Sequence, residues 1–249
     1  MATLVAAVLI GLSLGALGGG GSILTVPVLV YLAGVAPTAA IAASLVVVGL
    51  TAGIAVIAHG RAGRVAWRTG ALFALVGVVG AFAGARLGAH LPPALLLGAF
   101  AVLMIAVAAL MLGPRRQPTE VKVGPANDWP PLLRVALIGT AVGLTTGLLG
   151  AGGGFIIVPA LLLVGLDMST AVGTSLLVIA ANCAAGLAGH LGHTDIDWPL
   201  TLGVTALAVV GSLAGSRLVR HLDPDLLRRA FGALVALIGT AVLTAQFLH

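Results

Sequence analysis

Two glycine-rich runs contain the residues whose type and spacing could do chemistry. The runs span 18–21 and 150–154, and a proline follows each of them, at Pro27 and Pro159. The first turn of a helix carries unpaired N–H groups and a partial positive charge, and glycines let a ligand approach that backbone. Two helix starts of this kind predict a binding site for a small anion. The expected contacts are Gly18, Gly20, Gly21, Ser22, Pro27, Gly150, Gly152, Gly153, Gly154 and Pro159.

The glycines and prolines also have plainer explanations. Small residues let helices cross closely in lipid, and the runs could serve only that purpose. A short helix is expected to begin between Ser22 and Pro27, and another between Phe155 and Pro159. Proline suits the first helical position, although it could instead kink a slightly longer helix. The same break at matching places in two halves favours the binding site, because that arrangement marks the sites of many transporters.

Polar side chains in the apolar segments after each run could complete the site. Ser44 lies in the first half, and Thr174 and Ser175 lie at the matching place in the second. Their hydroxyl groups could donate to an oxyanion without adding charge. The alternative is helix capping or hydrogen bonding between helices, worth about 0.6–2 kcal/mol. Asn182 is an amide in the middle of a predicted span, so we expect it to face protein or water.

Matched histidines and arginines stand at the ends of the predicted helices. His59 and His190 could couple proton movement to transport, since histidine titrates near neutral pH. The alternative is a histidine at the interface that is satisfied by water or backbone. Arg86 and Arg217 either gate the path of the anion or extend to the lipid headgroups.

A metal site is a weaker hypothesis. His190, His193, Asp195 and Asp197 lie close together in the sequence and are residue types that bind metals. No further ligand or catalytic carboxylate is evident elsewhere in the chain, so neither a metal nor a cofactor is expected.

The composition indicates the environment of these residues. Of 249 residues, 60% are hydrophobic and 8% are charged, against about 25% charged in a soluble domain. The chain is therefore expected to be a polytopic, all-α integral membrane protein. The formal net charge of +5 reflects arginines in short connections and does not point to nucleic acid. The single cysteine, Cys183, excludes an intrachain disulfide.

Ten apolar segments must position the candidate site. Two of them, 22–34 and 155–166, directly follow the glycine runs and are short enough to be half-helices. The polar stretch 113–131 divides the chain into a first repeat, 1–112, and a second repeat, 132–249. The other eight segments are 2–17, 38–58, 69–89, 94–112, 132–149, 169–189, 199–219 and 225–247.

The two halves match at a nearly constant offset. Pro27 and Pro159 differ by 132 residues, and rarer residue types further along match at 131. These later pairs are His59 and His190, Trp67 and Trp198, Arg86 and Arg217, His90 and His221, and Pro93 and Pro224. Such a match over nearly one hundred residues per half predicts an internal structural repeat.

Charge predicts that the two repeats are inverted. The connection 59–68 carries three arginines and no acid, whereas its counterpart 190–198 carries two aspartates and no Lys or Arg. Positive residues favour the cytoplasmic side, so 59–68 is expected inside and 190–198 outside, with the bias reversed in the next connections. This pattern requires five crossings per half, or three plus a re-entrant hairpin. The basic linker would lie inside and both termini outside.

Three stretches of the chain are distinctive, namely GLLGAGGGFIIVP, STAVGTSLLV and GHLGHTDIDW. They resemble the TauE/SafE family of sulfite exporters, also called TSUP permeases, and the resemblance covers nearly the whole chain. It implies a permease of the cytoplasmic membrane for small sulfur-containing anions such as sulfite or organosulfonates. The first half departs from the pattern at Ala43, Arg64 and Ala66, where the second half has Thr174, Asp195 and Asp197.

Other functions remain open at this stage. A passive anion channel has the same sequence requirements as a carrier. An intramembrane enzyme would need convergent catalytic groups, and the predicted spans contain no Asp or Glu apart from Asp225, the first residue of 225–247. An assembly role would leave the repeated breaks without a purpose. The expected partners are a small anion and the lipid bilayer, and the sequence does not indicate an oligomeric state.

Overall fold

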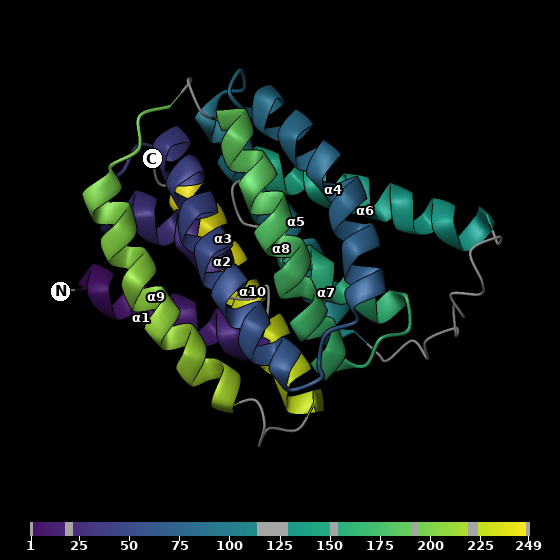
Figure 1. Cartoon of the computed structure of the whole chain (residues 1–249). Coiled ribbons are helices and arrows are strands. Elements are labelled where there is room, and N and C mark those ends of the chain that lie inside the picture. The colour runs from purple at the N-terminus through teal and green to yellow at the C-terminus, as the bar shows by residue number, and fades with distance from the viewer. Residues whose placement is uncertain are drawn as a thin grey trace.

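The computed structural model consists of helices throughout the part of the chain that it describes, which comprises residues 2–17, 22–113, 129–149, 154–190, 194–218 and 224–247 (Figure 1). No strand occurs in these ranges, and the prediction of an all-α protein is confirmed. The first half contains α1 (Ala2–Leu17), α2 (Ser22–Pro27), the π-helix η2 (Val28–Leu32), α3 (Pro37–Arg61), α4 (Trp67–Gly88) and α5 (Pro93–Leu112). The second contains α6 (Trp129–Leu149), α7 (Gly154–Leu163), α8 (Met168–His190), α9 (Trp198–Leu218) and α10 (Pro224–Phe247).

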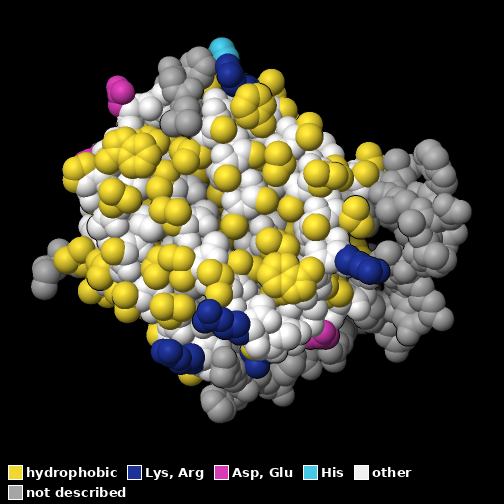
Figure 2. Space-filling view, viewed as in Figure 1, with side chains coloured by type: hydrophobic (Ala, Val, Ile, Leu, Met, Phe, Trp, Pro, Cys, Tyr) yellow, Lys and Arg dark blue, Asp and Glu magenta, His cyan; other side chains and the backbone are white. Residues whose placement is uncertain are grey.

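Four of the helices, α3, α4, α8 and α9, are long and apolar enough to cross a bilayer, which agrees with the prediction of a polytopic membrane protein. Figure 2 shows apolar side chains across the middle of the visible face, with Lys and Arg gathered mainly along its lower edge. Most of the expected linker, residues 114–128 of 113–131, lies outside the described residues.

The short helices begin earlier than one of the sequence interpretations required. The α2 helix starts at Ser22 and α7 starts at Gly154, so Pro27 and Pro159 lie inside their helices and not at the first position. The alternative of a proline within a slightly longer helix is therefore the correct one. After Pro27 the chain continues as the π-helix η2.

Glycine stops both short helices. Gly34 follows η2 and Gly165 follows α7, and both have positive φ angles, of 69° and 97°. The residues after them, Val35 and Leu166, donate N–H bonds back to Leu29 and Leu161. This is the helix-ending geometry that glycine adopts without a steric penalty. The two short segments are thus bounded in the same way in both halves.

The first helix of each half packs on the fourth helix of the other half. In the α1–α9 contact, a Cβ atom at Gly11 would overlap the Ala208 carbonyl oxygen. In the α4–α6 contact, a Cβ atom at the matching Gly143 would overlap the Gly77 carbonyl oxygen. Backbone approach of this kind is how helices gain packing energy in lipid, where apolar burial alone gives little.

The equivalent central helices also meet each other. The α3 and α8 helices are in contact, α5 contacts α10, and α2 contacts α7. The apolar side chains of Ile23, Val26 and Val158 join α2 and α7 in one buried cluster with α5. The short helices are therefore enclosed by protein, which is the environment that a broken helix requires at membrane depth.

Candidate functional site

The starts of the two short helices lie in the interior. Ser22 is fully buried, Gly154 is also buried, and their helices α2 and α7 touch. Six predicted glycine contacts lie outside the described residues, namely Gly18, Gly20, Gly21, Gly150, Gly152 and Gly153. The described part of the site thus consists of two buried helix starts, one from each half, with Pro27 and Pro159 inside the same helices.

The hydroxyl groups of the matched serines, Ser44 and Ser175, donate hydrogen bonds within their own helices. Ser44 Oγ donates to the Ile41 carbonyl oxygen at 2.7 Å, and Ser175 Oγ donates to the Val172 carbonyl oxygen at 2.8 Å. Both side chains are fully buried. In this conformation a serine hydroxyl can accept a bond but does not donate one to a ligand. The alternative left open by the sequence was helix capping or hydrogen bonding between helices, whereas both of these bonds run to a carbonyl three residues earlier in the same helix.

Thr174 links the two halves. Its Oγ1 accepts the backbone N–H of Ala66, from the connection between α3 and α4, at 2.9 Å. The adjacent Gly173 lies directly against the Arg64 carbonyl oxygen. The α8 helix therefore closes tightly on the 59–66 connection. No sequence pattern indicates this bond, because its donor is a main-chain group of the other half.

Asn182 is a buried amide without a hydrogen-bond partner among the residues that the structure describes. It is fully buried in α8, and neither Oδ1 nor Nδ2 has a hydrogen-bond partner among the described residues. The amide faces Gly77 of α4, where an added Cβ would lie 2.5 Å from Oδ1. An amide buried without partners costs about 1–3 kcal/mol per group, so this position is expected to serve water or a ligand.

The two histidines occupy equivalent buried positions. His59 Nε2 is 3.3 Å from the Gly15 carbonyl oxygen, and His190 Nε2 is 3.1 Å from the Gly147 carbonyl oxygen. Each ring therefore joins the end of α3 or α8 to the helix that precedes the glycine run of its own half. Their side chains are 2% and 4% exposed, so other protein groups cover both rings, and a backbone carbonyl oxygen lies within hydrogen-bond distance of each Nε2.

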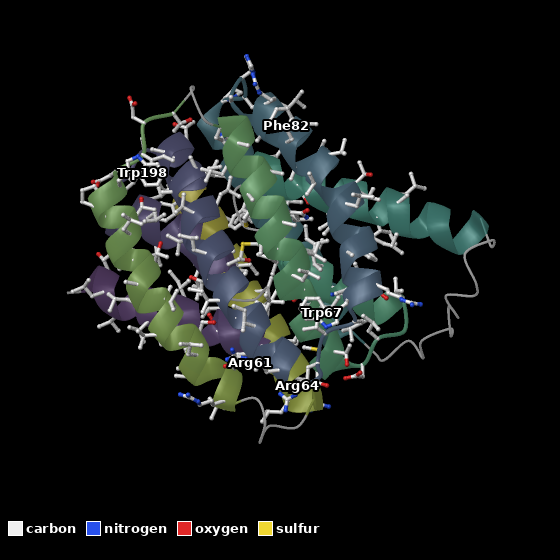
Figure 3. The ribbon with its side chains drawn as sticks, in the orientation of Figure 1. Arg61, Arg64, Trp67, Phe82 and Trp198 are labelled. Atoms are coloured by element: carbon white, nitrogen blue, oxygen red, sulfur yellow. The ribbon has the colours of Figure 1, made fainter. Side chains whose placement is uncertain are left out.

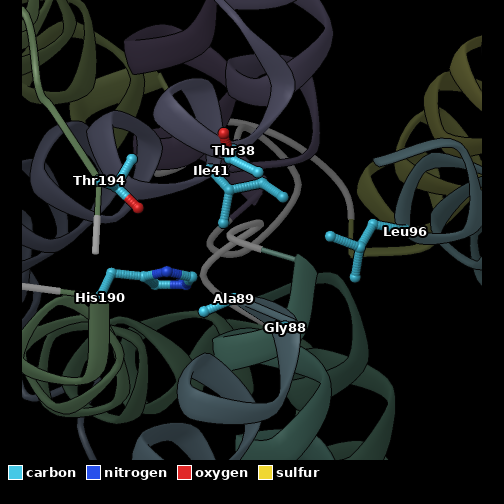
Figure 4. A pocket seen from close by; sticks show the side chains of 7 residues that line it. All are labelled: Thr38, Ile41, Gly88, Ala89, Leu96, His190 and Thr194. Atoms are coloured by element: carbon cyan, nitrogen blue, oxygen red, sulfur yellow. The ribbon is translucent and has the colours of Figure 1, made fainter. Parts of the chain in front are cut away.

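A cavity of about 70 Å³ adjoins His190 (Figure 4). It lies between the start of α3, the ends of α4 and α8, and α5. Its polar lining comes from His190, Thr38 and Thr194, and the remaining lining residues are Ile41, Gly88, Ala89 and Leu96. Thr38 and Thr194 cannot be recognised as site residues from the sequence, because only the packing of separate elements brings them together.

Arginine and aromatic side chains lie near both ends of the helices. Figure 3 shows Arg61, Arg64 and Trp67 toward one end of the helices, and Phe82 and Trp198 toward the other. Arg86 is exposed, with its guanidinium 5.3 Å from the centre of the Phe82 ring, and Arg217 is also exposed. Exposed arginines at helix ends fit extension toward headgroups better than a buried gate.

No cluster of three His, Cys, Asp or Glu side chains suited to a metal occurs among the described residues, and His193 lies outside them. The single cysteine, Cys183, is buried against Gly49 of α3.

Comparison with known proteins gives one family. The model of the family described as sulfite exporter TauE/SafE matches residues 3–242. A probable membrane transporter protein of Xylella fastidiosa (strain 9a5c) is 35% identical, over 94% of this chain and 91% of its own length. The probable membrane transporter protein YdhB of Bacillus subtilis (strain 168) is 25% identical, over 94% and 96%. No solved structure shows a significant match.

Proposed function

The chain belongs to the TauE/SafE sulfite exporter family of membrane transporters, and from that premise we propose that it transports small sulfur-containing anions such as sulfite or organosulfonates. Its relatives are named as transporters, so the prediction of a transporter and not an enzyme is confirmed. The substrate class and its binding site are our proposal.

The observation that carries this proposal is the contact between α2 and α7. Both short helices begin in the interior directly after a glycine run, and protein surrounds both of them. A buried helix start offers N–H groups and partial positive charge to an anion without introducing a cation into the membrane. The proposed contacts are the residues of both glycine runs with Ser22, Gly154, Thr174 and Asn182.

We also propose that the two halves, 1–112 and 132–249, are inverted repeats in the cytoplasmic membrane. Two observations support this topology. The equivalent residues Trp67 and Trp198 lie toward opposite ends of the helices in Figure 3, and each first helix packs on the fourth helix of the other half. The 59–68 connection would face the cytoplasm. Cysteines introduced at Arg64 and Asp195, in a Cys183→Ala background, should then label from opposite sides of the membrane.

Flux in proteoliposomes tests the substrate proposal. We expect Gly154→Leu and Gly20→Leu to reduce radiolabelled sulfite uptake at least tenfold, because a leucine blocks access to the backbone N–H groups. Gly203→Leu is the matched control, since a Cβ at Gly203 has no neighbour within 4 Å and the residue is exposed. Uptake that survives both site variants would exclude the glycine site. Thermal unfolding of each variant separates a blocked site from a loss of folding.

Counterflow distinguishes a carrier from a channel. Unlabelled sulfite loaded inside the vesicles should accelerate the entry of labelled sulfite through a carrier but not through a simple pore. Binding measurements with sulfite, thiosulfate, sulfate, sulfonates and carboxylates would then identify the preferred anion. Binding of carboxylates alone would contradict the proposed substrate class.

A further inference from the structure

Residues that match by the repeat offset have different surroundings at the two ends of the molecule. At one end, His190 and Thr194 border the cavity together with Thr38 (Figure 4). The repeat offset relates these three residues to His59, Gly63 and Thr170 at the other end. Both histidines make the same bond to the preceding helix of their own half, so this difference arises beyond the histidine rings.

At the His59 end, α8 is pressed against the connection that leads into α4. Gly173 lies against the Arg64 carbonyl oxygen, and a Cβ there would also come within 3.3 Å of His59 Cβ. Beside it, Thr174 Oγ1 accepts the Ala66 N–H at 2.9 Å. Both contacts join one half of the chain to the other, so this end is held closed by contacts between the halves.

At the His190 end, the equivalent hydrogen bond cannot form. The residue that matches Thr174 is Ala43, which has no hydroxyl and packs with Ile196 and Leu200 in an apolar cluster. The cavity nearby has a volume of about 70 Å³, which is more than twice the volume per molecule of about 30 Å³ in liquid water. Two threonines and a histidine line it; the threonine hydroxyls supply neutral donors that suit a small oxyanion, whereas His190 Nε2 donates to the Gly147 carbonyl oxygen.

We propose that the cavity beside His190 accepts a small oxyanion from the 190–197 side, while the Thr174–Ala66 contact closes the equivalent position at the other end. This inference rests on the proposed transport function and adds to it a point of entry and a closing contact. Transport then requires a second conformation that is closed beside His190 and open near His59. In that conformation the Thr174–Ala66 bond is broken. Because only one end has this bond, the conformation closed near His59 is the favoured one.

Cysteine accessibility in nanodiscs tests the proposal, with all variants in a Cys183→Ala background. Thr38→Cys should react with a water-soluble maleimide several times faster than Thr170→Cys, its counterpart. An organosulfonate, which unlike sulfite does not react with maleimide, should slow labelling at Thr38→Cys. Adding Thr174→Val, which removes the acceptor, should raise the labelling rate at Thr170→Cys about fivefold, the factor expected for one lost hydrogen bond. Thr174→Ser keeps the hydroxyl and is the matched control, with a rate close to that of the parent.

The outcomes separate the two proposals. Equal labelling at Thr38→Cys and Thr170→Cys, with no response to Thr174→Val, would overturn the inference even if sulfite flux is present. The expected labelling pattern together with an absence of flux for every anion would instead contradict the proposed function. If Thr174→Val does not fold, Ala66→Pro removes the N–H donor from the same bond, and it should raise the Thr170→Cys rate in the same way.

Discussion

The two halves build the same helices but stabilise the starts of those helices differently. In the second half, α8 begins at the Asp167 carboxylate, which accepts N–H bonds from Ser169 and Thr170, and α9 begins at Asp197, which accepts one from Leu200. In the first half, α3 and α4 begin after Ala36 and Ala66, which have no capping side chain. The second half therefore caps its own central helices, whereas the start of α4 relies on Thr174 from the other half.

This difference teaches that a repeat can keep its shared architecture while its two copies diverge in function. Close backbone contacts and the histidine bonds occur in both copies, so they support the architecture. The caps, Thr174 and Asn182 occur in one copy only, and two of these features lie beside the proposed path of the anion. Substitutions at matched positions should thus have equal effects in the two halves where the contact is shared. They should have unequal effects where only one half has the polar group.

The largest effect is expected at the shared glycine contacts. Gly11→Leu and Gly143→Leu each force a side chain into a carbonyl group of the facing helix, Ala208 or Gly77. Overpacking against rigid backbone should lower the free energy of unfolding by about 3 kcal/mol in both variants. Thermal unfolding in detergent measures this loss, with Gly203→Leu as the unaffected control. A loss in only one of the two variants would show that the halves do not share this contact energetically.

A smaller but more selective effect is expected at Asn182. Its amide has no partner among the described protein groups, so Asn182→Val should leave stability unchanged or raise it by about 1 kcal/mol. Sulfite flux should nevertheless fall about tenfold, because the variant lacks the unpartnered amide that we expect to bind the substrate or its water. The matched residue Thr51 donates to the Val47 carbonyl within its own helix, so Thr51→Val should leave flux unchanged. Lower stability with normal flux for Asn182→Val would assign the amide a structural role.

The rate of maleimide labelling at Thr38→Cys should fall about threefold when the first half receives the hydroxyl that it lacks. Ala43→Thr places an acceptor where Thr174 lies in the other copy, and the N–H of Asp197 is the equivalent donor. This change should slow maleimide labelling of Thr38→Cys, because it stabilises closure at the His190 end. Ala43→Val has a similar size without the acceptor, and it controls for crowding in the apolar cluster. Equal slowing by both variants would show that bulk and not the bond closes this end.

The sequence predicts the elements better than it predicts their junctions. Gly34 and Gly165 end helices by backbone chemistry that is local, so the ends of the short helices can be predicted. The position of Pro27 within its helix was open, because proline suits the first helical position but can also lie further along a kinked helix. The cavity beside His190 and the Thr174–Ala66 bond could not be predicted, because each joins groups more than one hundred residues apart. Asn182 could be singled out, since an amide is conspicuous in an apolar segment.

The smallest effect is expected at the cap of α8, and it depends on pH. Burial raises the pKa of Asp167, but hydrogen bonds from the Ser169 and Thr170 side chains and backbone outweigh it, so the net pKa lies below the ordinary value of 3.8. A carboxyl with a lowered folded pKa stabilises the fold above its unfolded pKa, and this stabilisation is lost as the pH falls through the folded value. Stability should therefore be constant above about pH 5 and should decline below about pH 4.

Two substitutions isolate this contribution at Asp167. Asn is as good a cap as Asp, so Asp167→Asn should match the parent at neutral pH and should lack this part of the acid-induced loss. Asp167→Ala should be less stable at neutral pH by about 1 kcal/mol, because the N–H groups of Ser169 and Thr170 lose their acceptor. Thermal unfolding measured from pH 3 to pH 7 compares all three proteins. Parallel curves for the parent and Asp167→Asn would show that the ionised carboxylate adds nothing beyond the cap. In that case the α8 start would differ from the uncapped α3 start only by hydrogen bonding and not by charge.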